Sequence, residues 1–201
     1  MSNVFQKTII EKVIFKGIGL HSGVKTEVKI LVLGLDNAGK TTFLERTKSM
    51  YSANKSASVP LDRITPTIGL NMGRLQAHGC DVTLWDLGGQ QSFRSIWDKY
   101  FDDADILIYV VDAADETRFT EAAKTLTTVL EHTEKLPVLV VANKSDMPLS
   151  HDVDSLRTLF HMEEVTSRRT ANLLAASALT SAGVADALQW VIETVKMEKG
   201  E

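Results

Sequence analysis

The chain has 201 residues and a formal net charge of −4, and 44% of its residues are hydrophobic and 24% charged. This composition is typical of one globular domain, and its acidic balance argues against a broad nucleic-acid-binding surface. A single cysteine, Cys80, excludes an internal disulfide and a multi-cysteine metal site. Because no apolar run approaches the roughly 18 residues of a membrane span, the sequence predicts no membrane-crossing helix.

The first 27 residues differ from the rest of the chain in the sign of their net charge. They carry four lysines against two glutamates, a balance of +2 that leaves −6 for the other 174 residues. Phe5, Ile9 and Val13 recur at four-residue steps, as in a short membrane-directed helix. The β-branched residues of the same stretch favour a strand instead, and three glycines follow it. We expect residues 1–23 to be peripheral to the fold, poorly ordered or membrane-directed.

Part of this N-terminal stretch resembles a known family of enzymes. The run KTIIEKVIFKGIGLHSGVKTEV resembles the opening of the zinc-dependent UDP-3-O-acyl-N-acetylglucosamine deacetylases. The likeness is confined to this run, and His21 is its single histidine. Since one histidine does not make a zinc site, the resemblance implies no deacetylase activity here.

From residue 28 onward, short β-rich runs alternate with helical patterns. Strands are expected at 28–33, 82–85, 106–112, 138–142 and 173–177. Helices are expected at 40–49, 91–100, 116–131, 153–160 and 184–196. Several of the strand runs are apolar throughout, which is typical of strands buried on both faces. The alternation predicts an α/β fold with a mostly parallel sheet, helices on both faces and a ligand at the carboxyl ends of the strands.

A phosphate-binding loop follows the first expected strand directly. Residues 34–42 read GLDNAGKTT and fit the pattern GxxxxGK[ST], whose backbone N–H groups surround a phosphate at the start of a helix. In this pattern Lys40 reaches the outer phosphates and the Thr41 hydroxyl binds Mg²⁺. The flanking strand and helix argue against the alternative, a glycine turn with a chance lysine. The predicted phosphate-binding residues are Gly34, Leu35, Asp36, Asn37, Ala38, Gly39, Lys40, Thr41 and Thr42.

A second motif indicates which base is bound. Asn143, Lys144 and Asp146 belong to the sequence NKSD, at the end of an expected strand. The Asp146 carboxylate can accept hydrogen bonds from both N1–H and the amine of guanine, a donor pair that adenine lacks, and Lys144 can lie along the base. The segment Ser177, Ala178 and Leu179 can offer a backbone N–H to guanine O6. Taken alone, NKxD is also a plausible surface loop.

Two segments between these motifs can sense the terminal phosphate. In WDLGGQ, Asp86 suits a water-mediated Mg²⁺ contact, Gly89 can bring its N–H to the γ-phosphate, and Gln90 can orient the attacking water. In PTIG, the hydroxyl of Thr67 can complete the Mg²⁺ shell when a γ-phosphate is present. The alternatives are a plain turn for the glycines and a solvated side chain for Gln90.

Taken in order, GLDNAGKTT, PTIGLN, WDLGGQ, NKSD and SAL resemble the Arf and Arf-like branch of the small GTPases, and most closely its Arf-related subgroup. The resemblance covers residues 28–196. It implies a P-loop NTPase fold with a six-stranded sheet, a GTPase domain at 28–197, an atypical extension at 1–27 and a tail at 198–201. It also implies GTP and GDP as ligands with Mg²⁺, and a cytoplasmic monomer that acts peripherally at Golgi membranes in trafficking.

The family further implies an exchange factor, a GTPase-activating protein and trafficking effectors as partners. Leu70, Trp85 and Tyr100 match the apolar triad on which effectors dock, although the two aromatic residues can instead be core residues. Asp36 stands where Ras-like proteins have glycine, and no arginine lies in the phosphate loop. We therefore expect slow intrinsic hydrolysis that depends on an arginine from the activating protein.

Membrane recruitment is the point at which the sequence departs from the family. Position 2 is Ser2, whereas many Arf relatives are acylated on a glycine there. Peripheral membrane contact then depends on the basic, apolar start of the chain or on a partner. A GTP-loaded binding module that never hydrolyses is the main alternative function. A P-loop kinase would need a second substrate site and does not explain NKSD.

Overall fold

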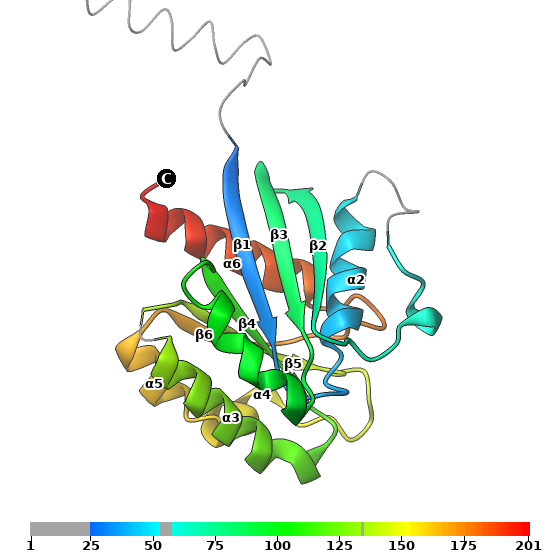
Figure 1. The fold of residues 1–201 in the computed structure, drawn as a ribbon. Coiled ribbons are helices and arrows are strands. Elements are labelled where there is room, and N and C mark those ends of the chain that lie inside the picture. The colour runs from blue at the N-terminus through cyan, green and yellow to red at the C-terminus, as the bar shows by residue number, and fades with distance from the viewer. Residues whose placement is uncertain (1–24, 53–57, 134) are drawn as a thin grey trace, which may run out of the picture.

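The structure is organised around one six-stranded sheet (Figure 1). The computed structural model describes residues 25–52, 58–133 and 135–201. The strand order is β2-β3-β1-β4-β5-β6, and every pairing is parallel except that of β2 with β3. The predicted mostly parallel, six-stranded sheet is therefore confirmed. The strands are β1 (Thr26–Leu33), β2 (Leu70–Ala77), β3 (Cys80–Leu87), β4 (Ile106–Asp112), β5 (Val138–Asn143) and β6 (Ala171–Ala175).

Helices cover both faces of the sheet, as expected (Figure 1). Alternate residues of β1 enter different cores: Ile30 and Val32 pack with α2 and α6, whereas Leu31 and Leu33 pack with α3, α4 and α5. Because both faces are covered, β1 is apolar along its buried length rather than alternating. The helices are α2 (Lys40–Tyr51), α3 (Phe119–His132), α4 (Val153–Leu159), α5 (Met162–Arg168) and α6 (Val184–Lys199), with 3-10 helices η2 (Leu61–Arg63), η3 (Gln91–Tyr100) and η4 (Glu116–Arg118).

Strand β2 is absent from the sequence prediction. It lies at the edge of the sheet, and its burial alternates, so it lacks the continuous apolar run of the central strands. A two-residue turn at His78 and Gly79, with φ of 48° and 79°, joins it to β3. Gly73 lets β2 approach α2, since a Cβ there would lie 3.1 Å from the Leu44 side chain. The alternation and the His-Gly pair are the signals that could have identified this hairpin.

Two helical predictions also differ from the structure. The expected helix at 91–100 forms 3-10 turns with Trp97 as its one buried residue, so a regular helix would gain little by packing there. The helix expected at 153–160 is α4, and α5 after it is missing from the prediction. His161 separates the two helices with a φ of 50°, a left-handed conformation that is uncommon for a residue with a side chain.

The described fold begins with β1 and ends with α6. β1 begins at Thr26, two residues before position 28, and α6 continues to Lys199, past position 197. The membrane-directed or strand-like conformation expected for residues 1–23 lies outside the described residues. Within the described part of the chain, no helix is both long enough and apolar enough to cross a membrane.

Candidate functional site

The loop between β1 and α2 has glycines at both of its tight corners. Gly34 has a φ of 138°, and a Cβ there would lie 2.2 Å from the Val110 carbonyl oxygen. Gly39 has a φ of 89°, and its Cβ would lie 2.3 Å from Nδ2 of Asn143. Both positions combine a left-handed backbone with a close neighbour, so only glycine fits. The glycines of the predicted phosphate loop are therefore required by the packing itself.

Lys40, the first residue of α2, points back into this loop. Its side chain is buried, and Nζ donates a hydrogen bond to the Leu35 carbonyl oxygen at 2.8 Å. Burial lowers the pKa of Lys40 from its ordinary value of 10.5 to about 8, and the charges of Asp86 and Asp36 oppose part of that shift. The chain thus holds an ammonium group where the sequence pattern places the phosphates.

A cavity of about 410 Å³ opens in front of Lys40. Its walls come from four separate segments: the loop at 36–42, residues 61–67, Gly89 with Gln90, and Lys144. Within the predicted loop, Leu35 and Ala38 are buried and shape the backbone instead of lining the cavity. Segments more than 100 residues apart in the sequence therefore meet at one edge of the sheet.

Three oxygen-bearing side chains meet at one point beside the cavity. The hydroxyl oxygens of Thr41 and Thr67 lie 2.7 Å apart, and they donate to Oδ2 of Asp86 at 2.6 and 3.2 Å. Asp86 is fully buried, and burial raises the pKa of its carboxyl group. Its Oδ1 makes no hydrogen bond to any described residue. Mg²⁺ prefers hard oxygen ligands and retains waters, so these two hydroxyls and the unpaired carboxylate oxygen fit a hydrated magnesium ion.

The loop that carries Gly89 and Gln90 lies directly against the phosphate loop. A Cβ at Gly89 would lie 2.4 Å from the backbone N of Asp36, so no side chain fits between the two backbones. Trp97 Nε1 donates to the Gly88 carbonyl oxygen at 3.1 Å and holds this loop to η3. Gln90 is exposed at the cavity wall. Its side chain therefore has access to whatever occupies the cavity.

Asn143 connects the phosphate loop to the predicted base-binding segment. Its Nδ2 donates to the Ala38 carbonyl oxygen at 2.8 Å, and its Oδ1 accepts from the Ala178 N–H at 3.0 Å. Lys144 lines the cavity and has a φ of 63°, and its Nζ donates to Oδ2 of Asp112 at 2.6 Å. Asp146 is exposed and lies outside the cavity lining.

The segment Ser177, Ala178 and Leu179 is held by its own backbone and by one side chain that sequence reasoning missed. The Ser177 N–H donates to the Ala182 carbonyl oxygen. The Ala178 N–H donates to Asn143, and among the described residues none accepts a hydrogen bond from the Leu179 N–H. Arg46, on α2, donates to the carbonyl oxygens of Ala178 and Leu179 at 2.9 and 2.6 Å. No sequence motif marks Arg46, because its partners lie more than 130 positions away.

Two further arginines reach the site from outside the phosphate loop. Arg118, in η4, donates to the backbone oxygen and to Oδ1 of Asp36, both at 2.8 Å. These contacts lower the pKa of the Asp36 carboxyl group. Arg94, in η3, donates to the Gly89 carbonyl oxygen at 3.0 Å. Neither arginine belongs to a recognisable motif, and Arg118 lies 82 positions from Asp36 in the sequence, so the sequence did not predict their contacts with the site.

The three residues of the predicted effector surface are only partly exposed. The rings of Trp85 and Tyr100 meet edge to face, with centroids 5.8 Å apart, and both pack partly against the core. Leu70 begins β2 and is 37% exposed. On the same strand Met72, which pairs with Trp85 across the hairpin, is 46% exposed. Ile68, which precedes β2, is 79% exposed. The aromatic pair thus borders an exposed apolar strip.

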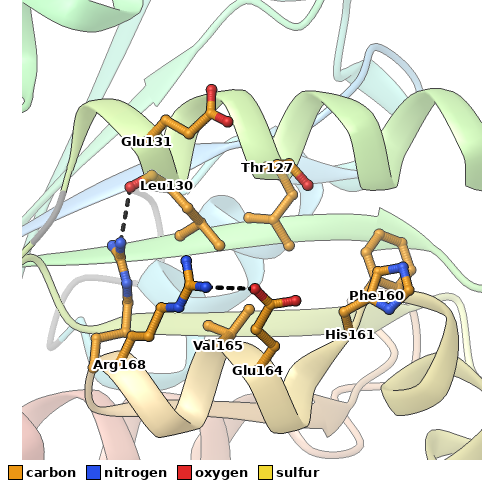
Figure 2. Close-up of a pocket in the computed structure, with 10 residues that line it drawn as sticks. Thr127, Leu130, Glu131, Phe160, His161, Glu164, Val165 and Arg168 are labelled. Atoms are coloured by element: carbon orange, nitrogen blue, oxygen red, sulfur yellow. Dashed lines mark hydrogen bonds and ion pairs between the residues drawn. The ribbon is translucent and has the colours of Figure 1, made fainter.

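A separate hollow of about 660 Å³ lies between α3 and α5 (Figure 2). Leu130 and Val165 provide apolar wall, and Arg168 forms an ion pair with Glu164 at 2.7 Å at its margin. None of the sequence-predicted site residues lines it. This hollow is therefore separate from the cavity beside Lys40, which the predicted phosphate-loop residues line.

Along the chain, the phosphate loop comes first, the Thr67 and Gly89 loops follow, and the Asn143 segment comes last. Their meeting at the carboxyl edge of a mostly parallel sheet defines the class of P-loop small GTPases. The ADP-ribosylation factor family matches residues 14–195, and the chain belongs to this family. As a small GTPase of this family, it binds GTP and hydrolyses it.

The relatives agree with this placement. The chain is 38% identical over 187 residues to human ADP-ribosylation factor-related protein 1, covering 90% of this chain and 92% of that protein. It is 38% identical over 190 residues to ADP-ribosylation factor-like protein 3 of Saccharomyces cerevisiae, covering 92% and 93% respectively. The Arl6 small GTPase of Trypanosoma brucei, solved with the bound nucleotide analogue GppNp, superposes with a TM-score of 0.74 at 26% identity, covering 86% of this chain and 99% of that one.

The lowered pKa of Lys40 predicts that nucleotide affinity falls as the pH rises through about 8. Below that pH the ammonium group is already charged. Above it, the neutral Lys40 amine must take up a proton before it can form an ion pair with the phosphates, so nucleotide binding weakens with increasing pH. The measurement is the GDP dissociation constant from about pH 7 to about 9.5.

The matched control for this titration is Lys40→Arg. Its guanidinium group stays protonated throughout the range, so its profile is expected to be flat even if its affinity is lower. A flat profile for the unmodified protein, or the same slope in both proteins, would contradict the assignment to Lys40.

Proposed function

We propose that this chain cycles between GDP and GTP states, hydrolyses GTP slowly and recruits effectors in Golgi and endosomal membrane trafficking. The observation that carries the proposal is the convergence of Thr41, Thr67 and Asp86 beside the buried Lys40. Thr67 comes from a loop outside the phosphate-binding segment, so its contact with Thr41 depends on how that loop is placed. A loop that reports on the terminal phosphate in this way is the basis of a nucleotide switch.

The position of the phosphate loop around the cavity supports the proposed phosphate contacts. Backbone N–H groups of 36–42 and the Lys40 ammonium hold the β- and γ-phosphates, and the start of α2 adds a positive dipole. Thr41, Thr67 and Asp86 would hold Mg²⁺, the two threonines by their hydroxyl groups and Asp86 through water. When bound, Mg²⁺ neutralises charge on the phosphate oxygens. Gly89 brings its backbone N–H to the γ-phosphate.

In the proposed reaction, Gln90 orients the attacking water toward the γ-phosphate. Its exposed position at the cavity wall supports this role. Arg94 and Arg118 are engaged with protein groups, and their guanidiniums donate to Gly89 and Asp36 rather than into the cavity. The transition state therefore depends on an arginine from an activating protein, a group that contributes about 10³ to 10⁵ in rate.

Single-turnover GTP hydrolysis, with and without an Arf-type activating protein, tests the hydrolysis proposal. We expect slow intrinsic turnover and strong stimulation. Equal turnover with and without the activating protein would contradict the expected stimulation. Unaided hydrolysis at several turnovers per second would contradict the dependence on an external arginine.

Replacing Gln90 with leucine is expected to lower stimulated hydrolysis by at least about 10²-fold, because the water loses its orienting group. GTP binding should be retained. Gln91→Leu is the matched control, since Gln91 is the neighbouring exposed glutamine and lies outside the cavity. Both variants are measured by phosphate release from preloaded protein. Equal rates in the two variants would refute the role proposed for Gln90.

For the base, we propose that Asp146 accepts from N1–H and the amine of guanine. Asn143 supports the loop, Lys144 lies along the base, and the segment Ser177 to Leu179 offers a backbone N–H to O6. The contacts of Asn143 with Ala38 and Ala178 support this proposal, because they join the phosphate and base segments.

Replacing Asp146 with asparagine is expected to change the preferred base from guanine to xanthine. Xanthine carries an oxygen where guanine carries its amine, and the asparagine amide can donate to that oxygen. The measurement is competition between GTP and xanthosine triphosphate for the variant, with Asp154→Asn on α4 as the exposed control. Retained tight GTP binding by Asp146→Asn would contradict the role proposed for Asp146 in guanine recognition.

The proposed partners are an exchange factor, an activating protein and trafficking effectors. Effectors would dock on Leu70, Trp85 and Tyr100, next to the exposed Ile68 and Met72. An aromatic pair beside an exposed apolar strip supports this surface, because such residues bury large area at little entropic cost. The chain is proposed to act as a monomer, without nucleic acid, and cytoplasmic with peripheral contact at Golgi and trans-Golgi membranes.

The N-terminal segment is the proposed source of membrane contact, on the basis of its positive charge and apolar spacing. Liposome flotation is expected to recover the full chain loaded with a non-hydrolysable GTP analogue on vesicles that contain phosphatidylserine. Protein lacking residues 1–23 should stay unbound. GDP loading and vesicles without anionic lipid serve as controls. Equal flotation of the two proteins would exclude the segment as the membrane contact.

A further inference from the structure

We propose that Glu121, on α3, is a positioning residue that joins the phosphate loop to the Gly89 loop through two arginines and thereby favours GTP over GDP. The proposal rests on the nucleotide switch proposed above and deepens it. Glu121 touches neither the cavity nor any of the sequence-predicted site residues. Its influence would pass through Arg94 and Arg118.

The two oxygens of the Glu121 carboxylate are divided between the two arginines. Oε1 accepts from Nη2 of Arg94 at 2.7 Å, and Oε2 accepts from Nη2 of Arg118 at 3.1 Å. Arg94 comes from η3, whereas Arg118 precedes α3. One carboxylate therefore bridges two separate parts of the chain.

Each arginine also holds one of the loops beside the proposed γ-phosphate position. Arg118 makes two hydrogen bonds to Asp36, one to its backbone oxygen and one to its side chain. Arg94 donates to the Gly89 carbonyl oxygen at 3.0 Å. The resulting chain of contacts runs from Asp36 through Arg118, Glu121 and Arg94 to Gly89.

The charges of this network balance. The pKa of the Glu121 carboxyl group is lowered, first by its hydrogen bond with Arg94, and that of Asp36 by its bond with Arg118. Both carboxylates are therefore ionised at neutral pH and face two cations. Asp36 lines the cavity, where an unpaired carboxylate would repel a terminal phosphate. Arg118 removes that repulsion, and Glu121 helps to hold Arg118 in place.

Closure of the two loops matters only when a γ-phosphate is present. Gly89 lies so close to the phosphate loop that a Cβ would reach within 2.4 Å of the Asp36 nitrogen. Loss of Glu121 would leave Arg94 held to α3 by a single long hydrogen bond, to Thr125 Oγ1 at 3.4 Å. It would release Arg94 from Arg118 and allow the two loops to separate. GTP binding would lose the Gly89 contact and gain repulsion from Asp36, whereas GDP has no group at that position.

The test compares Glu121→Gln with Glu131→Gln. Both residues are on α3 and exposed, but Glu131 has no polar partner among the described residues (Figure 2). We expect Glu121→Gln to accelerate dissociation of a non-hydrolysable GTP analogue by about 3- to 5-fold, in the range for loss of partly exposed ion pairs, while GDP dissociation changes less than about 2-fold. Glu131→Gln should match the unmodified protein for both nucleotides.

Salt dependence provides a readout that a purely structural role would not change. The GTP-over-GDP preference of the unmodified protein should fall as ionic strength rises, and that of Glu121→Gln should fall less steeply, because salt screens the γ-phosphate in both proteins but the ion-pair network only in the first. If Glu121→Gln fails to fold, Arg94→Lys replaces it, because a lysine cannot hold Gly89 and Glu121 together. Equal effects on GTP and GDP, or no effect, would overturn the inference. Absence of nucleotide binding by the unmodified protein would instead refute the proposed function.

Discussion

The site depends on one buried cation, the ammonium group of Lys40. A charge removed from water must be compensated locally, or the group loses its proton. Here the compensation comes from the Leu35 carbonyl oxygen and from the charges of Asp86 and Asp36. This requirement brings the carboxylates to the mouth of the loop. It also favours an anionic ligand beside Lys40, because nearby phosphates would raise the lowered pKa of its ammonium group back toward the ordinary value.

The second constraint is that the loops around the cavity hold one another. Asn143 joins the phosphate loop to Ala178, and Arg46 holds the same segment from α2. On the other side, Arg118 and Arg94 contact Asp36 and Gly89. Each of these hydrogen bonds involves at least one side chain. They therefore position loops that lack the regular backbone hydrogen bonds of a strand or helix. The edge of the sheet is thus a connected frame rather than a set of independent loops.

Local patterns predicted the elements whose signals are strong in the sequence. The continuous apolar runs of β1, β4 and β5 identified the buried strands, and GLDNAGKTT identified the loop between β1 and α2. The elements that were missed have weak signals. β2 is a half-exposed edge strand, and α5 follows a left-handed His161 where a glycine would have been recognisable. In both cases the element is stabilised by tertiary packing more than by its own pattern.

The sequence by itself determined the class of the protein, because the phosphate loop and the NKSD segment are read from neighbouring residues in a fixed order. It also determined the mostly parallel sheet, since burial on both faces leaves continuous apolar runs that can be recognised in the sequence. Only the tertiary structure decided how the loops are held. Arg46, Arg118 and Glu121 act on partners far along the chain or across helices, and such contacts leave no local pattern. Their roles follow from distances, which only the folded chain supplies.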